Sequence, residues 1–239
     1  MSLKDIYNAF TSNIILVGDK YDVENFSFDV KPLLYEYIDW PSDLMHKANG
    51  LAYWYMKGDR DDLSIIYYMP EYEYAMNKTN PFFNSNYGYY MFVQNYVEKC
   101  VRLLSLDEHS RRACFMINNN DVAFSDANDK LCTNAIAFRI INRQLNMTVQ
   151  MRSNHFIDNM PYDMYTFHIL YAVVYRLLLD RYKDLQIGNY HHTAISMHIN
   201  KSQLNALLRH RDKYYNTNNL IIDYERIYEV YKATACKKS

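Results

Sequence analysis

A cysteine, an arginine and an aspartate stand in two short runs of the sequence that could together bind and modify a nucleotide. Cys132 opens the run Cys132-Thr133-Asn134, and Asp163 follows Arg152 by eleven residues. A cysteine thiolate is a strong nucleophile, and the planar guanidinium of arginine matches the oxygens of a phosphate. A carboxylate accepts hydrogen bonds from an amino-bearing ring such as cytosine. These residue types therefore predict a site for a pyrimidine nucleotide.

The hydrophobic pattern around these residues predicts the elements that must position them. Residues 135–141 read as a strand and 142–144 as a turn. From 145 to 152 apolar and polar residues alternate strictly, which is typical of a half-buried strand and leaves Arg152 on its polar face, at its end. A helix predicted from about 162 to 182 has Asp163 in its first turn, where a carboxylate is favoured in any protein. This helix-end role is an alternative explanation of Asp163.

The rest of the chain mixes helical and strand patterns without a regular alternation. Helices are predicted over three further ranges, 30–50 (closed near Pro41), 88–105 and 202–211. Two more strands are predicted, at 114–117 and 192–199. The stretch 58–86 is rich in charged and turn residues and reads as irregular or surface-exposed. The pattern indicates an α+β, or mixed α/β, fold in a single domain of residues 1–239.

Composition and charge argue against several classes of protein. The 239 residues, of which 49% are hydrophobic, suffice for a sizeable core, and a net charge of −1 does not favour a general electrostatic grip on nucleic acid. The four cysteines lack the CxxC spacing of zinc sites, and the adjacent His191 and His192 would point to opposite faces of a strand, so we expect no metal. The start of the chain is polar and no apolar stretch reaches the ~18 residues of a membrane helix. We therefore expect a cytoplasmic protein without a membrane partner.

Several motifs in chain order resemble those of the thymidylate synthase superfamily. They are Asn84-Ser85-Asn86-Tyr87-Gly88, Ser110-Arg111-Arg112, Cys132-Thr133-Asn134, Arg152-Ser153 with Asp163 eleven residues on, and Ser196-Met197-His198. Within the superfamily, the Cys-Thr-Asn and Met-Arg-Ser-Asn runs and the aspartate are similar to the phage deoxycytidylate hydroxymethylase branch. The resemblance covers roughly residues 84–200, whereas residues 1–83 match poorly. It implies a thymidylate synthase-like fold, a mixed β-sheet with flanking helices, in a homodimer that packs sheet against sheet.

The resemblance also implies catalytic roles. Cys132 is expected to add to ring carbon 6 of the pyrimidine, so that carbon 5 can attack a one-carbon donor. A nearby cation must lower the pKa of the thiol, and Arg152 is the expected one. Tyr87 is expected in the proton network near the ring. The family has a glutamate that organises water and protons three residues before a tryptophan, and Glu36, four residues before Trp40, is the candidate.

The substrate contacts implied by the resemblance surround the nucleotide. The 5′-phosphate is held by Arg152 and Ser153, with Arg111 and Arg112 donated by the partner subunit across the homodimer interface. The 3′-hydroxyl is touched by His198, although the family's tyrosine two residues later is replaced by asparagine. The complete set expected to bind substrate is Arg111, Arg112, Arg152, Ser153, Asn154, Asp163 and His198.

Asp163 indicates which base is bound. Uracil presents a donor at nitrogen 3 and an acceptor at oxygen 4, which the asparagine of thymidylate synthases satisfies. Cytosine presents an amino donor and an unprotonated nitrogen 3, which a carboxyl group can serve by accepting one hydrogen bond and sharing or supplying a proton. The function predicted is conversion of dCMP to 5-hydroxymethyl-dCMP, with water capturing the intermediate. Two alternatives stay open: C5 methylation of dCMP or dUMP, and nucleotide binding without catalysis.

The cofactor implied by the resemblance is 5,10-methylenetetrahydrofolate. His155 stands where the family has an aspartate that contacts the pterin, and Asn159 stands where a glycine is usual. The segment 235–239 does not resemble the tail that closes over folate in thymidylate synthases. A different carbon donor is therefore also open. The branch implies a virus that modifies its DNA, and hence a host cytoplasm.

Overall fold

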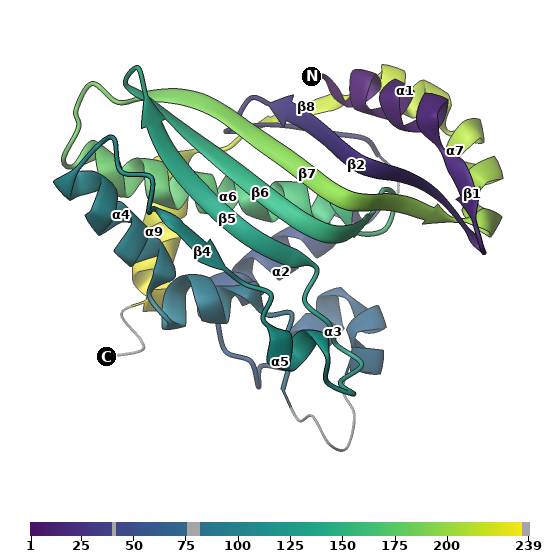
Figure 1. Cartoon of the computed structure of the whole chain (residues 1–239), viewed down its shortest axis with the longest axis horizontal. Coiled ribbons are helices and arrows are strands. Elements are labelled where there is room, and N and C mark those ends of the chain that lie inside the picture. The colour runs from purple at the N-terminus through teal and green to yellow at the C-terminus, as the bar shows by residue number, and fades with distance from the viewer. Residues whose placement is uncertain (40–41, 76–81, 236–239) are drawn as a thin grey trace.

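A six-stranded mixed sheet forms the centre of the molecule in the computed structural model, which describes residues 1–39, 42–75 and 82–235 (Figure 1). From edge to edge its strands are β1 (Ile15–Val17), β2 (Lys20–Val30), β7 (Gln186–Asn200), β6 (Gln144–His155), β5 (Thr133–Ile141) and β4 (Cys114–Met116). Only β6 and β7 pair in parallel. The strands predicted at 114–117, 135–141, 145–152 and 192–199 are confirmed, and three of them are longer than predicted.

The β5–β6 hairpin carries the nucleophile motif and the arginine motif on adjacent strands. Its two turn residues, Asn142 and Arg143, both have positive φ, +51° and +61°, as a two-residue hairpin turn with the twist of the sheet requires. The alternation predicted for β6 is present, because Leu145, Met147, Val149 and Met151 are all buried. The hairpin therefore fixes Thr133 opposite Met151, which brings the start of β5 beside the end of β6.

Helix α6 (Met160–Leu179) is the crossover that parallel pairing of β6 and β7 demands. Most of its side chains are buried, so it is apolar around its circumference, as a helix enclosed on all sides must be. It packs under the sheet against α2 (Leu44–Lys57) and α9 (Tyr224–Ala235), and Figure 1 shows these helices on one face of the sheet. The helix predicted from about 162 to 182 is confirmed with slightly earlier ends.

Shorter elements complete the fold. The helices are α1 (Leu3–Asn13), α3 (Ser64–Tyr68), α4 (Tyr96–Leu106), α5 (Asn120–Ala123), α7 (Leu204–Arg209) and α8 (Arg211–Tyr215), with 3₁₀ turns at η1 (Pro70–Ala75) and η3 (Lys201–Gln203) and a π turn at η2 (Tyr89–Val93). A two-stranded sheet joins β3 (Leu34–Tyr37) to β8 (Asn218–Ile221).

Three predicted elements differ from the structure. The helix expected over 30–50 is wrong: β2 ends at Val30, Leu33 turns the chain with a φ of +63°, and a helix begins only at Leu44. Trp40, expected within that helix, and Pro41, expected to close it, lie outside the described residues. The helix expected over 88–105 is interrupted, because Asn95 has a φ of +57° between η2 and α4. The helix expected over 202–211 is divided among η3, α7 and the start of α8.

The stretch 58–86 was predicted to be irregular or surface-exposed, and this is wrong in part. Its described residues include α3 and η1, and the side chains of Ile65 and Phe83 are fully buried. The positions 76–81 lie outside the described residues. Packing against α2 orders this segment, a long-range effect that its local composition of turn and charged residues does not reveal.

The second face of the sheet is not covered by any described element. Thr148, Gln150 and Arg152 on β6 are exposed on this face, and the apolar Met116 and Ile195 are 59% and 45% exposed on the flanking strands β4 and β7. A sheet with apolar side chains exposed on one face is suited to pack against another sheet. Within the described residues, no helix is long and apolar enough to span a membrane.

Candidate active site

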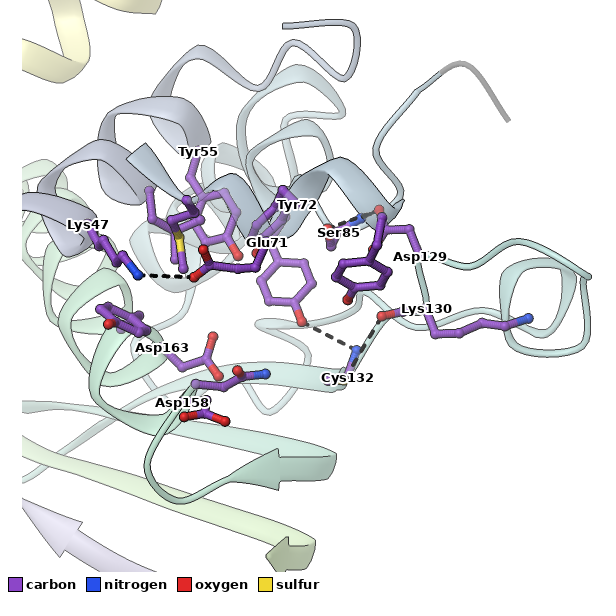
Figure 2. Close-up of a pocket in the computed structure, with 16 residues that line it drawn as sticks. Lys47, Tyr55, Glu71, Tyr72, Ser85, Asp129, Lys130, Cys132, Asp158 and Asp163 are labelled. Carbon is purple, nitrogen blue, oxygen red and sulfur yellow. Dashed lines mark hydrogen bonds and ion pairs between the residues drawn. The ribbon is translucent and has the colours of Figure 1, made fainter. Parts of the chain in front are cut away.

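A cavity of about 520 Å³ lies between the ends of the central strands, α2, η1 and the start of α6. Three of the predicted residues, Cys132, Tyr87 and Asp163, line it together. Figure 2 shows Cys132 and Asp163 on its lower side, with Tyr55, Tyr72 and Glu71 above them. The full lining is Lys47, Leu51, Tyr55, Met69, Glu71, Tyr72, Tyr74, Ser85, Tyr87, Asp129, Lys130, Cys132, Asp158, Asn159, Tyr162 and Asp163.

Tyr87 holds the backbone at Cys132. Its hydroxyl oxygen accepts hydrogen bonds from the N–H groups of Cys132 and Thr133, at 3.3 and 3.4 Å. Its ring stacks on Tyr55, with 5.2 Å between centroids. Burial, followed by the charges of Cys132 and Asp163, holds the pKa of Tyr87 well above its ordinary value, so its O–H keeps its proton. The residue is therefore a donor that can serve a proton network beside the thiol.

Arg152 contacts the thiol directly. Its Nη2 lies 3.6 Å from Cys132 Sγ, while its Nε donates to the carbonyl oxygen of Leu131 at 2.8 Å. Burial raises the pKa of Cys132, the positive charge of Arg152 lowers it, and the charges of Asp163 and Asp129 raise it further. The net shift is upward. The cation predicted from the sequence is present. In the single chain, however, the effect of burial on the pKa of Cys132 is larger than that of Arg152, so the protonated thiol is favoured.

A buried aspartate ties the nucleophile loop to the segment that carries Tyr87. The Asp129 carboxylate accepts hydrogen bonds from the N–H and the hydroxyl of Ser85, at 2.9 and 3.0 Å, and Asn84 donates to the Asp129 carbonyl at 3.1 Å. Neither Ser85 nor Asp129 was predicted from the sequence, although Ser85 lies within the motif Asn84–Gly88. An acid three residues before the nucleophile was the available signal for Asp129.

Asp163 lies in the first turn of α6 and also lines the cavity. The cap residue of α6 is Asn159, which makes no side-chain capping hydrogen bond, and Asp163 is the acidic residue of the first turn, as the helix-end explanation requires. Burial raises the pKa of Asp163 to about 8, against a smaller lowering effect of the Asn154 side chain. The carboxyl group is therefore mostly protonated at neutral pH, and it offers the cavity both a donor and an acceptor.

Ser153 and His198 meet where β6 and β7 end. The Ser153 hydroxyl and His198 Nδ1 are 3.5 Å apart, and Ser196, which donates to Asp22 at 2.7 Å, is equally close to the same ring nitrogen. Burial lowers the pKa of His198 to about 4, which keeps the imidazole neutral. A neutral ring and a hydroxyl group suit a sugar or phosphate oxygen, but neither residue belongs to the cavity lining.

Arg111 and Arg112 lie apart from the cavity, on the loop between α4 and β4. Both residues are exposed, and in the part of the chain that the structure describes no side chain accepts a hydrogen bond from either guanidinium. Their exposure is compatible with donation to another copy of the chain. That role stays a prediction.

Comparison with solved structures identifies the architecture. The chain is similar to thermostable thymidylate synthase A from Bacillus subtilis, with a TM-score of 0.67 over 94% of this chain and 96% of that chain, at 14% sequence identity. The fold is thymidylate synthase-like. The mixed sheet with flanking helices that the resemblance implied is therefore confirmed. No protein-family model matches the sequence, and no curated protein matches it either.

Glu36 does not reach the cavity of this thymidylate synthase-like fold. It lies on β3, where its carboxylate accepts a hydrogen bond from the N–H of Leu3 at 2.6 Å and another from the hydroxyl of Thr217. The other tryptophan of the chain is Trp54, and the residue three positions before it is Leu51, which lines the cavity. The position three residues before a tryptophan, where a glutamate was expected, thus lies in the cavity wall but carries the apolar side chain of leucine. The catalytic role predicted for Glu36 is not supported by its position.

His155 lies beside the cavity but not in its wall. Its Nδ1 accepts the N–H of Asp158 at 3.0 Å, so the neutral ring carries its proton on Nε2. Nε2 lies 3.4 Å from the Asp158 carboxylate but makes no hydrogen bond to it. Burial lowers the pKa of His155, which favours this neutral form. The cavity wall is formed here by Asp158 and Asn159. The predicted contact between His155 and a cofactor stays a prediction.

The wall of the cavity contains an ion pair that was not predicted from the sequence. Lys47 Nζ lies 3.4 Å from the carboxylates of both Glu71 and Asp43, and Lys47 and Glu71 line the cavity (Figure 2). These residues come from α2 and η1, within the region that matches the family poorly. No spacing in the sequence links them, so only the packing of η1 on α2 and α3 brings them together. Among the described residues, no group of His, Cys, Asp and Glu could hold a metal ion.

Proposed function

We propose that this protein transfers a one-carbon unit to ring carbon 5 of a pyrimidine nucleoside monophosphate, with dCMP as substrate and 5-hydroxymethyl-dCMP as product. The observation that carries this proposal is that Cys132 and Asp163 line the same cavity. One is a nucleophile and the other a carboxyl group that can read the pyrimidine edge. The thymidylate synthase-like fold supports C5 transfer as the class of reaction.

In the proposed reaction the Cys132 thiolate adds to ring carbon 6. The thiol must first lose its proton, and the positive charge of Arg152, 3.6 Å away, stabilises the thiolate. Tyr87 keeps Cys132 in position through its two backbone hydrogen bonds and offers its O–H to the proton network near the ring. After carbon 5 has acquired the one-carbon unit, loss of the carbon 5 proton would expel the nitrogen of the carrier and leave a methylene group double-bonded to carbon 5. Water would then add to this methylene, and the displaced electron pair would re-form the double bond between carbons 5 and 6 as Sγ leaves as the thiolate.

Asp163 activates the base in this proposal. Its carboxyl group, with a pKa of about 8, is mostly protonated at neutral pH and can supply a proton to nitrogen 3 of cytosine. A proton at nitrogen 3 withdraws electrons from the ring and makes carbon 6 easier for Cys132 to attack. The resulting carboxylate accepts a hydrogen bond from the 4-amino group. The same residue thus recognises the base and promotes the addition.

The sugar and phosphate would extend from the cavity toward the ends of β6 and β7. There Arg152 and Ser153 would bind the 5′-phosphate and His198 the 3′-hydroxyl. Arg152 lies beside Cys132, and Ser153, the next residue along β6, lies beside His198. Arg111 and Arg112 would complete the phosphate site from a second copy of the chain, with the uncovered sheet faces packed together. A homodimer is therefore part of the proposal.

The walls of the cavity fit a flat heterocycle such as a pterin. Tyr55, Tyr72, Tyr162 and Met69 supply aromatic and apolar surface, and the Asp158 carboxylate can accept hydrogen bonds from ring N–H groups. 5,10-Methylenetetrahydrofolate would supply the one-carbon unit at the oxidation level of formaldehyde. The residues that would hold it are these four and Asp158, rather than His155.

The test is incubation of the protein with dCMP, dUMP or CMP and methylenetetrahydrofolate, with products followed by mass. We expect 5-hydroxymethyl-dCMP from dCMP and no product from the Cys132→Ser variant, which should still bind the nucleotide. Turnover of dUMP alone would contradict the choice of substrate. Stoichiometric dihydrofolate would indicate methylation instead.

A second candidate function, nucleotide binding without catalysis, is favoured by one specific observation. Leu51 occupies the cavity position at which the family spacing calls for a proton-handling glutamate, and burial raises the pKa of Cys132. Release of tritium from carbon 5 of labelled dCMP separates the two functions, because it requires Cys132 addition but no product formation. Nucleotide binding without any tritium release would favour the second candidate. In either case we propose a cytoplasmic setting, that of a host cell if the protein is viral.

A further inference from the structure

A second cavity, of about 230 Å³, lies between the start of α1, the end of β2, the β3–β8 sheet and α6. Helix α6 contributes to both cavities, with Tyr162 and Asp163 in the wall of the first and Met164 and His168 in the wall of the second. No described residue lines both. The second cavity is therefore a space separate from the one that contains Cys132.

His168 is a buried polar side chain in the wall of the second cavity. Burial lowers the pKa of His168 to about 3, so the imidazole is neutral and carries one proton. Its Nδ1 accepts a hydrogen bond from the N–H of Leu33 at 3.1 Å, which places the proton on Nε2. Within the described part of the chain, no group accepts a hydrogen bond from this Nε2–H.

The imidazole of His168 is held in a fixed orientation. The rings of Tyr35 and Tyr190 pack edge to face with it, at 5.7 and 5.5 Å between centroids, and the bond to Leu33 anchors Nδ1. The ring cannot turn to find another acceptor without breaking these contacts. A buried donor without an acceptor is unfavourable, and the second cavity is the space from which an acceptor can approach His168.

The rest of the lining adds an acceptor and apolar surface. The carboxylate of Glu36 accepts hydrogen bonds from the N–H of Leu3 at 2.6 Å and from the hydroxyl of Thr217. A carboxylate offers about four acceptor positions, so two remain for a ligand. The apolar side chains of Ile6 and Met164 complete this part of the wall. A ligand would thus be bound by one donor and one acceptor against an apolar surface.

The size of the second cavity limits its ligand. Its volume is below the ~300–1,000 Å³ of most small-molecule sites, so a molecule with a single ring is the size that fits.

The charges in the lining disfavour an anionic ligand. The carboxylate of Glu36 repels a negative charge, and the ammonium group of Lys31 donates to the carbonyl oxygens of Ile187 and Gly188 at 3.3 and 3.5 Å. We propose that the second cavity binds a small, uncharged cyclic amide, whose carbonyl oxygen accepts from His168 Nε2 and whose N–H donates to Glu36. A simple lactam and a free pyrimidine base both have this chemistry.

The test is titration of the full chain with 2-piperidone, a six-membered lactam, followed by protein NMR. We expect saturable binding with a dissociation constant of about 1 mM, which a molecule of this size can reach. The control is 1-methyl-2-piperidone, which keeps the carbonyl oxygen but lacks the N–H for Glu36. It should bind at least about tenfold more weakly, the equivalent of one hydrogen bond.

Two substitutions of His168 separate its two nitrogen atoms. His168→Asn can still accept the N–H of Leu33 but is too short to place a donor where Nε2 lies, and it should bind 2-piperidone at least about tenfold more weakly. His168→Gln places an amide nitrogen near the position of Nε2 and should keep most of the affinity. Leu34→Trp enlarges a side chain that lines the cavity and is 43% exposed, so it should fold and abolish binding.

Thermal melting shows which variants are folded, and only those are compared. Binding of 2-piperidone that is unchanged in both His168→Asn and Leu34→Trp would place the ligand elsewhere and overturn the proposal. The absence of saturation at tenfold above the expected constant would mean that the cavity holds water only, which also overturns it.

A parallel titration with uracil distinguishes the two sources of the amide. Because uracil could also enter the first cavity, only the part of its binding that is lost in Leu34→Trp counts. Tighter binding of uracil than of 2-piperidone would assign the second cavity to a pyrimidine base, and the reverse to a simple lactam. The affinity for dCMP should be the same in all three variants, since none of these residues lines the first cavity. Failure of the wild type to bind dCMP would therefore contradict the proposed function but not this inference.

Discussion

The replacement Asp163→Asn tests the buried carboxyl group on which the proposed function depends. The two side chains are nearly isosteric. The change therefore removes the ionisation of residue 163 and little else. Burial raises the pKa of Asp163 from 3.8 to about 8, so ionisation of this group lowers the free energy of unfolding of the wild type. The variant cannot ionise at residue 163 and should not lose stability in this way.

The sign and size of the effect follow from linkage. An acid whose pKa is raised by folding stabilises the folded state fully below its unfolded pKa, and that contribution is lost as pH rises toward the folded pKa. The raised pKa of Asp163 corresponds to a loss of ~6 kcal/mol in the free energy of unfolding, which is complete above pH 8. Only ~2 kcal/mol of this is already lost at pH 5. Relative to wild type, Asp163→Asn should gain ~4 kcal/mol in free energy of unfolding between pH 5 and pH 9. This is a large part of the ~5–15 kcal/mol by which proteins are stable.

Urea unfolding followed by tryptophan fluorescence at pH 5, 7 and 9 measures this difference. Asp129, which is also buried with a raised pKa, is present in both proteins and its contribution cancels. The exposed Asp126 provides a matched control, and Asp126→Asn should show no comparable dependence on pH. A constant difference between Asp163→Asn and wild type from pH 5 to pH 9 would refute the buried, protonated carboxyl group, and with it the activation of the base by Asp163.

Three further predictions concern other parts of the site and its supports. Arg152→Leu removes the cation beside Cys132, which should raise the thiol pKa further and slow the alkylation of Cys132 by iodoacetamide near pH 8, as measured by peptide mass mapping. Glu36→Ala removes two hydrogen bonds far from the cavity, so it should lower the free energy of unfolding by about 1–3 kcal/mol per bond while nucleotide affinity in calorimetry is unchanged. Gly88→Ala would bring a methyl group within 1.6 Å of the Tyr55 carbonyl oxygen, and should lower the free energy of unfolding by about 3 kcal/mol or more and weaken nucleotide binding.

Each of these has a contrary outcome. Alkylation of the exposed Cys114 serves as an internal control for Arg152→Leu, and an unchanged ratio between the two cysteines would argue against an effect of the arginine. Loss of nucleotide binding in a folded Glu36→Ala protein would mean that Glu36 acts at the site despite its distance from the cavity wall. Wild-type stability of Gly88→Ala would contradict the close packing of Gly88 on α2 that holds Tyr87 beside Tyr55.

Where the position of a side chain depends only on its own strand, the hydrophobic pattern in the sequence was sufficient to predict it. The strict alternation along β6 predicted the strand and the polar-face position of Arg152, because a period of two leaves no other assignment of faces. The left-handed residues of the β5–β6 turn were not predicted individually, but a short turn between the two strands was. Where local signals conflicted, as over 30–50, an apolar spacing that resembled a helix was overridden by pairing of β2 with β7 and of β3 with β8.

The sequence by itself predicted Cys132 as the nucleophile, Arg152 as its companion and Asp163 as the carboxyl group that reads the base, since each stands in a short motif at a fixed spacing. Tertiary structure alone decided their environment. The pKa of Asp163 and that of Cys132 depend on how completely α6, α2 and the sheet exclude water, and exclusion of water is a property of packing rather than of spacing. Packing likewise left Glu36 outside the cavity, placed Leu51 in its wall, and set Asn154, His192 and Tyr190 in contact, because residues far apart in the chain meet only when the sheet and helices close around them.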